Sequence, residues 1–257
     1  MSGACAVAQL QRNLSQATLM TDGLDSNVIA RNVRTVLDRI RQAALRASRQ
    51  PDAIRLVAAT KTVSPDRIRP AIEAGVRILG ENRLQEALPK VTAIGSCDDV
   101  RWHFIGRLQR RKVKAVVGIF QMIHSVDSVE LAVEINRRAE DAGLTQEVLL
   151  EVTIAGESSK GGFAPSELSA ALAAVEGLPN LSVKGLMAVP PLTTEPERTR
   201  PYFRALRDLA RSLADRGLGR ARMDELSMGM SHDYEVAVEE GATLVRVGTA
   251  IFGSRHA

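Results

Sequence analysis

The 257-residue chain has little cysteine and few aromatic rings: two cysteines, and only 3% of Phe, Trp and Tyr together. Cys5 and Cys97 are too few for a disulfide framework, and two isolated cysteines are most often unpaired thiols. So few rings also make a series of base-stacking platforms for single-stranded nucleic acid improbable. The composition therefore disfavours both a disulfide-stabilised domain and a base-stacking nucleic-acid binder.

Long apolar runs are missing as well. No run reaches the roughly 18 to 20 residues that a membrane-spanning helix needs. The first twenty residues mix Gln, Asn, Arg and small residues, without the apolar block of a signal peptide. We therefore expect a cytoplasmic protein without a membrane partner.

Charge is slightly in excess on the positive side, with a formal net charge of +4 and a pI near 9.4. The excess is mostly arginine, spread along helical patterns as at Arg31, Arg34, Arg39, Arg41, Arg46 and Arg49. A solvated helix face explains this spacing better than a nucleic-acid footprint does. No nucleic-acid partner is predicted.

Short β-branched runs alternate with longer amphipathic segments, which is typical of βα units and a parallel sheet. An opening helix is predicted over about Asp25 to Ser48. The predicted strands are Ile54–Thr60, Arg77–Leu79, Arg101–Ile105, Phe120–His124, Glu147–Thr153, Leu181–Met187, Met223–Leu226 and Thr243–Val247. The predicted helices between them are Pro65–Ala74, Arg83–Ile94, Leu108–Val117, Ser128–Ala142, Pro165–Val175, Glu197–Arg216 and Asp233–Glu240.

Eight strands with intervening helices over this length favour a single α/β domain, a closed TIM-like (β/α)8 barrel with an extra N-terminal helix. An open doubly wound sheet has similar local patterns and stays an alternative at this point. Residues 1–23 have no partner in the βα pattern and are predicted to be a disordered tail. Residues 24–257 are then the barrel domain.

In such a barrel, functional residues gather where the βα loops follow the strands. Lys61 comes directly after the apolar run 56–60, where partial desolvation would disfavour its ammonium form, as a Schiff-base lysine requires. From position alone, a lysine whose stem packs at a strand end is the more common explanation. His103 is predicted to be a hydrogen-bonded interior residue. His124 ends a strand, just before residues that can cap a helix.

The last quarter of the chain contains turns suited to an anion. Residues 226–231 (Leu-Ser-Met-Gly-Met-Ser) follow the seventh strand, and residues 246–253 (Arg-Val-Gly-Thr-Ala-Ile-Phe-Gly) contain the end of the eighth. TIM barrels often bind phosphate in these two loops. Because strands one and eight are neighbours in a closed barrel, a phosphate there would lie near Lys61. This arrangement favours a phosphorylated carbonyl cofactor.

At these residues the chain closely resembles the pyridoxal phosphate homeostasis protein family, whose fold is that of the alanine racemase N-terminal barrel. The matching blocks are 56–62 (LVAATKT), 80–86 (GENRLQE), 102–106 (WHFIG), 159–162 (SKGG), 185–188 (GLMA), 226–231 (LSMGMS) and 245–253 (VRVGTAIFG). They occur in the family's order across roughly residues 25 to 255, and together they are highly specific.

The resemblance implies pyridoxal 5′-phosphate (PLP) as cofactor, held as a Schiff base on Lys61. It places Arg246 at the pyridine nitrogen, where a cation weakens the ring as an electron sink. It further assigns Asn82 to the ring face, Met228 to the pocket wall, and Gly248, Thr249, Ser231 and Ser227 to the phosphate.

One position departs from the family pattern. After the Trp-His-Phe strand the family has Gly-x-Leu-Gln-x-Asn-Lys, whereas this chain has Arg111 in place of the small polar residue. Arg111 either adds an anion contact at the barrel mouth or points to solvent, and both alternatives stay open.

The family resemblance implies a PLP carrier or regulator in vitamin B6 and amino-acid homeostasis, without established turnover and with PLP-dependent apo-enzymes as candidate partners. The alternative is an amino-acid racemase. Alanine racemase needs a tyrosine base from a further β domain, across a dimer. The chain ends soon after the eighth strand, and neither Tyr202 nor Tyr234 matches that base by motif. We therefore expect a monomeric carrier rather than an efficient racemase.

Overall fold

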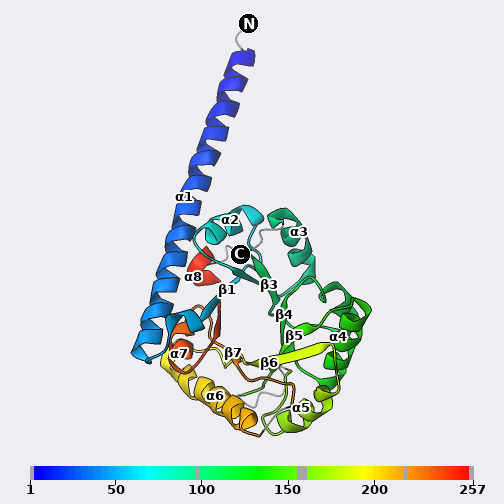
Figure 1. The fold of residues 1–257 in the computed structure, drawn as a ribbon. Coiled ribbons are helices and arrows are strands. Elements are labelled where there is room, and N and C mark those ends of the chain that lie inside the picture. The colour runs from blue at the N-terminus through cyan, green and yellow to red at the C-terminus, as the bar shows by residue number, and fades with distance from the viewer. Residues whose placement is uncertain (1–2, 96–98, 155–160, 217–218, 255–257) are drawn as a thin grey trace.

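The computed structural model describes residues 3–95, 99–154, 161–216 and 219–254, with side chains from residue 25 onward. Its centre is a closed barrel of parallel strands in sequential order, β1 to β8 (Figure 1). The strands are β1 Arg55–Ala59, β2 Ile78–Glu81, β3 Arg101–Phe104, β4 Met122–Val126, β5 Gln146–Glu151, β6 Leu181–Met187, β7 Glu225–Ser227 and β8 Leu244–Val247. The predicted barrel is confirmed, because β8 pairs with β1 and closes the sheet.

Helices cover the outside of the barrel. The α-helices after α1 are α2 Pro65–Glu73, α3 Leu84–Ile94, α4 Val129–Asp141, α5 Leu168–Glu176, α6 Arg200–Ala214, α7 Tyr234–Glu239 and α8 Thr249–Phe252. Short 3₁₀ turns are η1 Pro51–Ala53, η2 Arg110–Ala115 and η4 Pro196–Thr199. Among the described residues, no helix combines the length and apolarity that a membrane crossing requires.

The α-helix predicted over Leu108–Val117 is wrong: the segment forms the 3₁₀ turn η2. Val113 and Val116 are both buried, and side chains three residues apart are aligned in a 3₁₀ turn. The spacing of these two buried valines thus fits the tighter turn.

The opening helix α1 spans Gly3–Arg46, so it begins well before the predicted start near Asp25. It lies beside α2, α7 and α8, and its N-terminal part extends past the barrel (Figure 1). Its inner stripe contains Ile29, Val33, Val36 and Ile40, all buried. The division into a tail, residues 1–23, and a domain, residues 24–257, stays a prediction.

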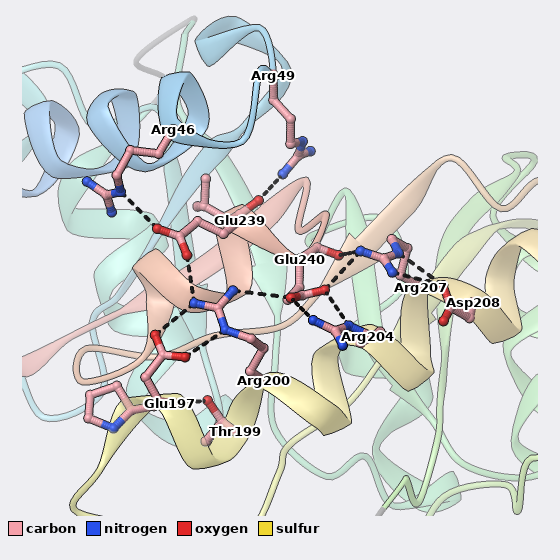
Figure 2. Close-up of polar contacts among 12 residues, drawn as sticks. Arg46, Arg49, Glu197, Thr199, Arg200, Arg204, Arg207, Asp208, Glu239 and Glu240 are labelled. Carbon is pink, nitrogen blue, oxygen red and sulfur yellow. Dashed lines mark hydrogen bonds and ion pairs between the residues drawn. The ribbon is translucent and has the colours of Figure 1, made fainter.

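Ion pairs fasten α1 and α6 to α7 (Figure 2). Arg46 Nε lies 2.9 Å from Glu239 Oε1, and Glu239 Oε2 lies 2.7 Å from Arg200. Glu240, whose side chain is 6% exposed, accepts hydrogen bonds from the guanidinium groups of Arg200, Arg204 and Arg207. The arginine-rich faces inferred from the sequence are therefore partly intramolecular contacts.

The barrel interior is filled by its own apolar layer, formed by Val57, Ile78, Met122, Leu149, Met187 and Leu244. Gly80 follows Ile78 on the same face, since alternate strand residues share a side. A Cβ at Gly80 would lie 2.8 Å from Val57 Cγ1 and 2.9 Å from Ile105 Cδ1. Any larger residue there would have to displace the Val57 and Ile105 side chains, directly below the mouth of the barrel.

Candidate functional site

Lys61 follows β1 at the C-terminal end of the barrel. It lines a cavity of about 320 Å³ together with Ala59, Thr62, Gly248 and Thr249. The strand register explains this meeting, because Ala58 of β1 pairs with Val247 of β8. A Cβ at Gly248 would lie 3.2 Å from Ala59 O, so the residue after β8 packs closely on β1. The predicted neighbourhood of Lys61 and Gly248-Thr249 is thus present.

Ser231 lies beside the same turn. Its Oγ accepts hydrogen bonds from Gly248 N at 3.0 Å and from Ala250 N at 3.3 Å. Asp233 holds the segment that carries Ser231, since its Oδ1 accepts from Met230 N at 2.6 Å. Two backbone N–H groups therefore converge on one oxygen, in the geometry that an oxyanion would use.

Arg246 is held inside the barrel by three acceptors and is only 6% exposed. It donates to Ser227 O at 2.8 Å, to Ala188 O at 3.0 Å and to Ser227 Oγ. Burial lowers the pKa of Arg246 to about 10, while the charges of Glu151 and Asp233 oppose that shift. The guanidinium therefore stays a fixed cation at neutral pH.

A chain of buried polar groups continues from Arg246 across the barrel. His124 Nδ1 lies 2.8 Å from Ser227 Oγ, and His124 Nε2 lies 2.9 Å from His103 Nδ1. A hydrogen bond between two ring nitrogens needs one N–H and one lone pair, so the two rings cannot both be protonated. Burial, followed by the charges of Arg55 and Arg101, lowers the pKa of His103 to about 3.

The pKa of His124 is also held well below its ordinary value, by burial and then by the neighbouring His103 and Arg246. Both imidazoles are therefore neutral in the fold at neutral pH. The prediction that His103 is a hydrogen-bonded interior residue is confirmed. The contact of His124 with Ser227 was not anticipated, because nothing local in the sequence relates residues 103 positions apart.

Asn82, the residue predicted to face the ring, lies at the end of the neighbouring strand. Asn82 follows β2, and its Oδ1 is buried without a hydrogen-bond partner among the described residues. A Cβ at Gly106 would lie 2.5 Å from Asn82 O, so the glycine of the WHFIG block lets the β3 loop pack against Asn82. A buried unsatisfied amide oxygen fits a place where a ligand group can bind.

Ser227, Met228 and Arg246 are not among the described residues that line the Lys61 cavity. The Ser227 hydroxyl is engaged by Arg246 and His124, so a phosphate contact from it stays a prediction. Met228 is fully buried in the core between the barrel and its helices, and its role as a pocket wall also stays a prediction. Arg111 is exposed, and its Nε donates to Gln109 Oε1 at 3.1 Å.

Several charged residues near the site escaped the sequence interpretation. Glu151, at the end of β5, has its pKa raised to about 7 by burial and by the charge of Asp127, against the opposing charges of Arg246 and Arg107. Glu81 and Lys90 form a buried ion pair with a Nζ–Oε1 distance of 2.7 Å. The signal for Glu81 was an acidic residue inside a short strand, directly before Asn82.

The two tyrosines lie on helices outside the barrel. Tyr234 is buried on α7, and Tyr202 is partly exposed on α6. Both stand outside the strand ends that surround Lys61.

Comparison with known proteins places the chain in a family. The model of the alanine racemase N-terminal domain matches residues 24–256. Curated proteins called pyridoxal phosphate homeostasis protein match most of the chain. The protein of Aquifex aeolicus is 47% identical over 86% of this chain and 95% of its own length. That of Pseudomonas aeruginosa is 44% identical over 89% of this chain and 96% of its own.

Solved structures agree with the barrel. PipY of Synechococcus elongatus PCC7942, solved with PLP bound, has a TM-score of 0.74 at 38% identity, covering 84% of this chain and 99% of PipY. Alanine racemase of Clostridium difficile 630 has a TM-score of 0.68 at 15% identity, covering 88% of this chain and 60% of the racemase. The racemase likeness concerns the fold alone. The chain belongs to the pyridoxal phosphate homeostasis protein family, on the barrel of the alanine racemase N-terminal domain.

Proposed function

We propose that this chain binds PLP through a Schiff base on Lys61 and takes part in the homeostasis of PLP and amino acids. The observation that carries the proposal is the meeting of three features at one end of the barrel. These are the amine of Lys61, the convergent N–H groups of Gly248 and Ala250, and the fixed cation of Arg246. PLP has one chemical group for each: an aldehyde, a phosphate and a pyridine ring.

The residues present fit the cofactor. Ser231 Oγ accepts hydrogen bonds from the N–H groups of Gly248 and Ala250, so this turn can donate in the same way to the oxygen atoms of a phosphate. Asn82 Oδ1 has no hydrogen-bond partner within the described part of the chain and is available to a ring substituent. When bound, PLP supplies an aldehyde, and condensation with a lysine amine forms a C=N bond and releases one water.

Arg246 favours holding PLP over using it. Its guanidinium keeps its charge at neutral pH and is locked onto Ser227 and the Ala188 carbonyl. A cation beside the pyridine nitrogen disfavours protonation of that nitrogen and so weakens the ring as an electron sink. This supports a carrier or regulator of PLP rather than a catalyst.

The experiment that tests the proposal is borohydride reduction of the purified protein after addition of PLP. We expect a visible absorbance band, and after reduction a PLP mass adduct on the peptide that contains Lys61. A Lys61→Ala variant should stay colourless with an unchanged circular dichroism spectrum, whereas Lys114→Ala, which removes an exposed lysine on η2, should be coloured like the parent protein. A Lys61→Ala variant with full colour and adduct would overturn the assignment.

We further propose that the protein is a cytoplasmic monomer that supplies PLP to PLP-dependent apo-enzymes. Support comes from the cavity beside Lys61, which opens at the exposed residues Thr62, Gly253 and Ser254, so that bound PLP could leave to solvent or to a partner. Mixing PLP-loaded protein with a PLP-dependent apo-enzyme should restore that enzyme faster than the same amount of released PLP does. Equal rates would remove direct transfer from the proposal. Light scattering during gel filtration measures the oligomeric state.

A further inference from the structure

A buried ion pair lies directly behind the strand end that carries Lys61. Lys90, on α3, and Glu81, at the end of β2, have side chains that are 8% and 0% exposed. Replacing such a pair with apolar residues is often neutral or stabilising, because removing two charges from water is costly. Glu81 Oε2 also lacks a hydrogen-bond partner within the described part of the chain. The pair is therefore poorly explained by stability alone.

Both members of the pair contact Thr60, the residue before Lys61. Lys90 Nζ donates to Thr60 O at 2.6 Å, and Thr60 Oγ1 donates to Glu81 Oε1 at 2.6 Å. The Thr60 carbonyl belongs to the peptide group that joins Thr60 to Lys61. The ion pair thus fixes the orientation of the peptide on the N-terminal side of Lys61.

The peptide on the other side of Lys61 is held by the same helix. Thr62 N donates to Glu86 Oε2 at 2.8 Å, and Glu86 lies one turn before Lys90 on α3. Thr62 has φ +63°, a left-handed conformation that a β-branched residue adopts only under external constraint. Two side chains of α3, Glu86 and Lys90, therefore hold the two peptide groups that flank the Lys61 Cα.

We propose that Glu81, Glu86 and Lys90 are positioning residues, which aim Lys61 at the barrel mouth and set how fast its amine captures the PLP aldehyde. The inference rests on the proposed function, since it concerns the same lysine. These residues act through the backbone of residues 60–62. They therefore affect the linkage to Lys61 more than the binding of the phosphate and the ring.

The test separates these two steps of binding. Pyridoxine 5′-phosphate has the ring and the phosphate of PLP but no aldehyde, so its affinity reports the site without the lysine linkage. The variants are Glu81→Gln/Lys90→Met, which removes both buried charges at similar volume, and Glu86→Ala. Stopped-flow absorbance follows formation of the linkage with PLP, and calorimetry gives the affinity for pyridoxine 5′-phosphate.

We expect linkage formation to slow by roughly 10- to 100-fold in both variants, as misplacement of a reacting group by about 1 Å does. The affinity for pyridoxine 5′-phosphate should change by less than about threefold. Glu86→Gln keeps an oxygen acceptor for Thr62 N and should restore most of the rate. Because Glu86 is partly exposed, its variants can decide the question even where the double variant fails to fold.

Wild-type rates in the Glu86→Ala variant and in the folded double variant would overturn the inference. A parallel loss of linkage rate, analogue affinity and melting temperature would also overturn it, since that pattern indicates a general structural role. If the wild-type protein gives no borohydride-fixed adduct on Lys61, the proposed function fails instead, which is a distinct outcome.

Discussion

Replacing the two buried histidines of the barrel, His103 and His124, by glutamine should make the protein less sensitive to acid. Both imidazoles have folded pKa values well below the ordinary value of about 6.5. The unfolded chain therefore takes up protons below about pH 6.5 that the folded protein does not take up. The free energy of unfolding must fall as the pH is lowered through this window.

The magnitude follows from the unfolded pKa alone, provided that the folded values lie below the measured range. Between about pH 7.5 and pH 5.5, each such imidazole costs about 1.4 kcal/mol of stability, and the two together cost about 2.7 kcal/mol. Urea unfolding at the two pH values measures the loss. Titration of carboxylates is common to all variants and cancels when their pH-dependent losses are compared.

We expect the loss to shrink by about 2.7 kcal/mol in the double variant and by about 1.4 kcal/mol in each single variant. The absolute stability at pH 7.5 will also change, because the hydrogen bonds to Ser227 are altered, but this offset does not enter the comparison. A double variant that loses as much stability as the wild-type protein would refute the assignment of two neutral buried imidazoles.

Two further predictions concern other polar contacts. Glu240→Gln should lower the free energy of unfolding by about 1–3 kcal/mol at neutral pH, measured by urea unfolding. Although burial raises the pKa of Glu240, hydrogen bonds from Arg204 and Arg200 and the charges of Arg204 and Arg207 outweigh it and lower the pKa. The stability that ionised Glu240 contributes is thus complete above its ordinary pKa and is lost as the pH falls through the folded pKa. If wild type and Glu240→Gln differed in unfolding free energy by the same amount at neutral and at strongly acidic pH, the prediction would be contradicted. Ser231→Ala should weaken PLP binding by about 10- to 100-fold but leave binding of pyridoxal, which lacks the phosphate, nearly unchanged; equal losses for both would remove Ser231 from the phosphate site.

Local patterns predicted the elements of the barrel well. The strand Leu181–Met187 was predicted with its observed bounds, and the helix after Ser64 begins at Pro65 as the Ser-Pro signal indicates. The segments that differed are those where local rules compete. At 110–116 the spacing of the buried Val113 and Val116 fits a 3₁₀ turn, and α1 begins at Gly3, well before the predicted start.

The sequence predicted the contacts between neighbouring strands of the site but not those that cross the barrel. Lys61 and Gly248 were placed together because neighbouring strands of a closed barrel must meet. Ser227 was assigned to phosphate from its position in the LSMGMS block, whereas its hydroxyl contacts Arg246 of β8 and His124 of β4 inside the barrel. Such cross-barrel contacts depend on strand stagger, and β4 pairs with β5 through a shift in register between Ile123 and Val126.

The sequence by itself determined the alternation of strands and helices, the lysine after the first strand and the small-residue turns after the last two, because each depends on neighbours in the chain. Only the tertiary structure decided what surrounds Lys61. The peptide groups on its two sides are held by Lys90 and Glu86 of α3, which lie 30 and 24 residues from their partners. The pairing of β1 with β2 and the packing of α3 against β2 create these contacts, and no local pattern specifies which distant charges the fold brings together.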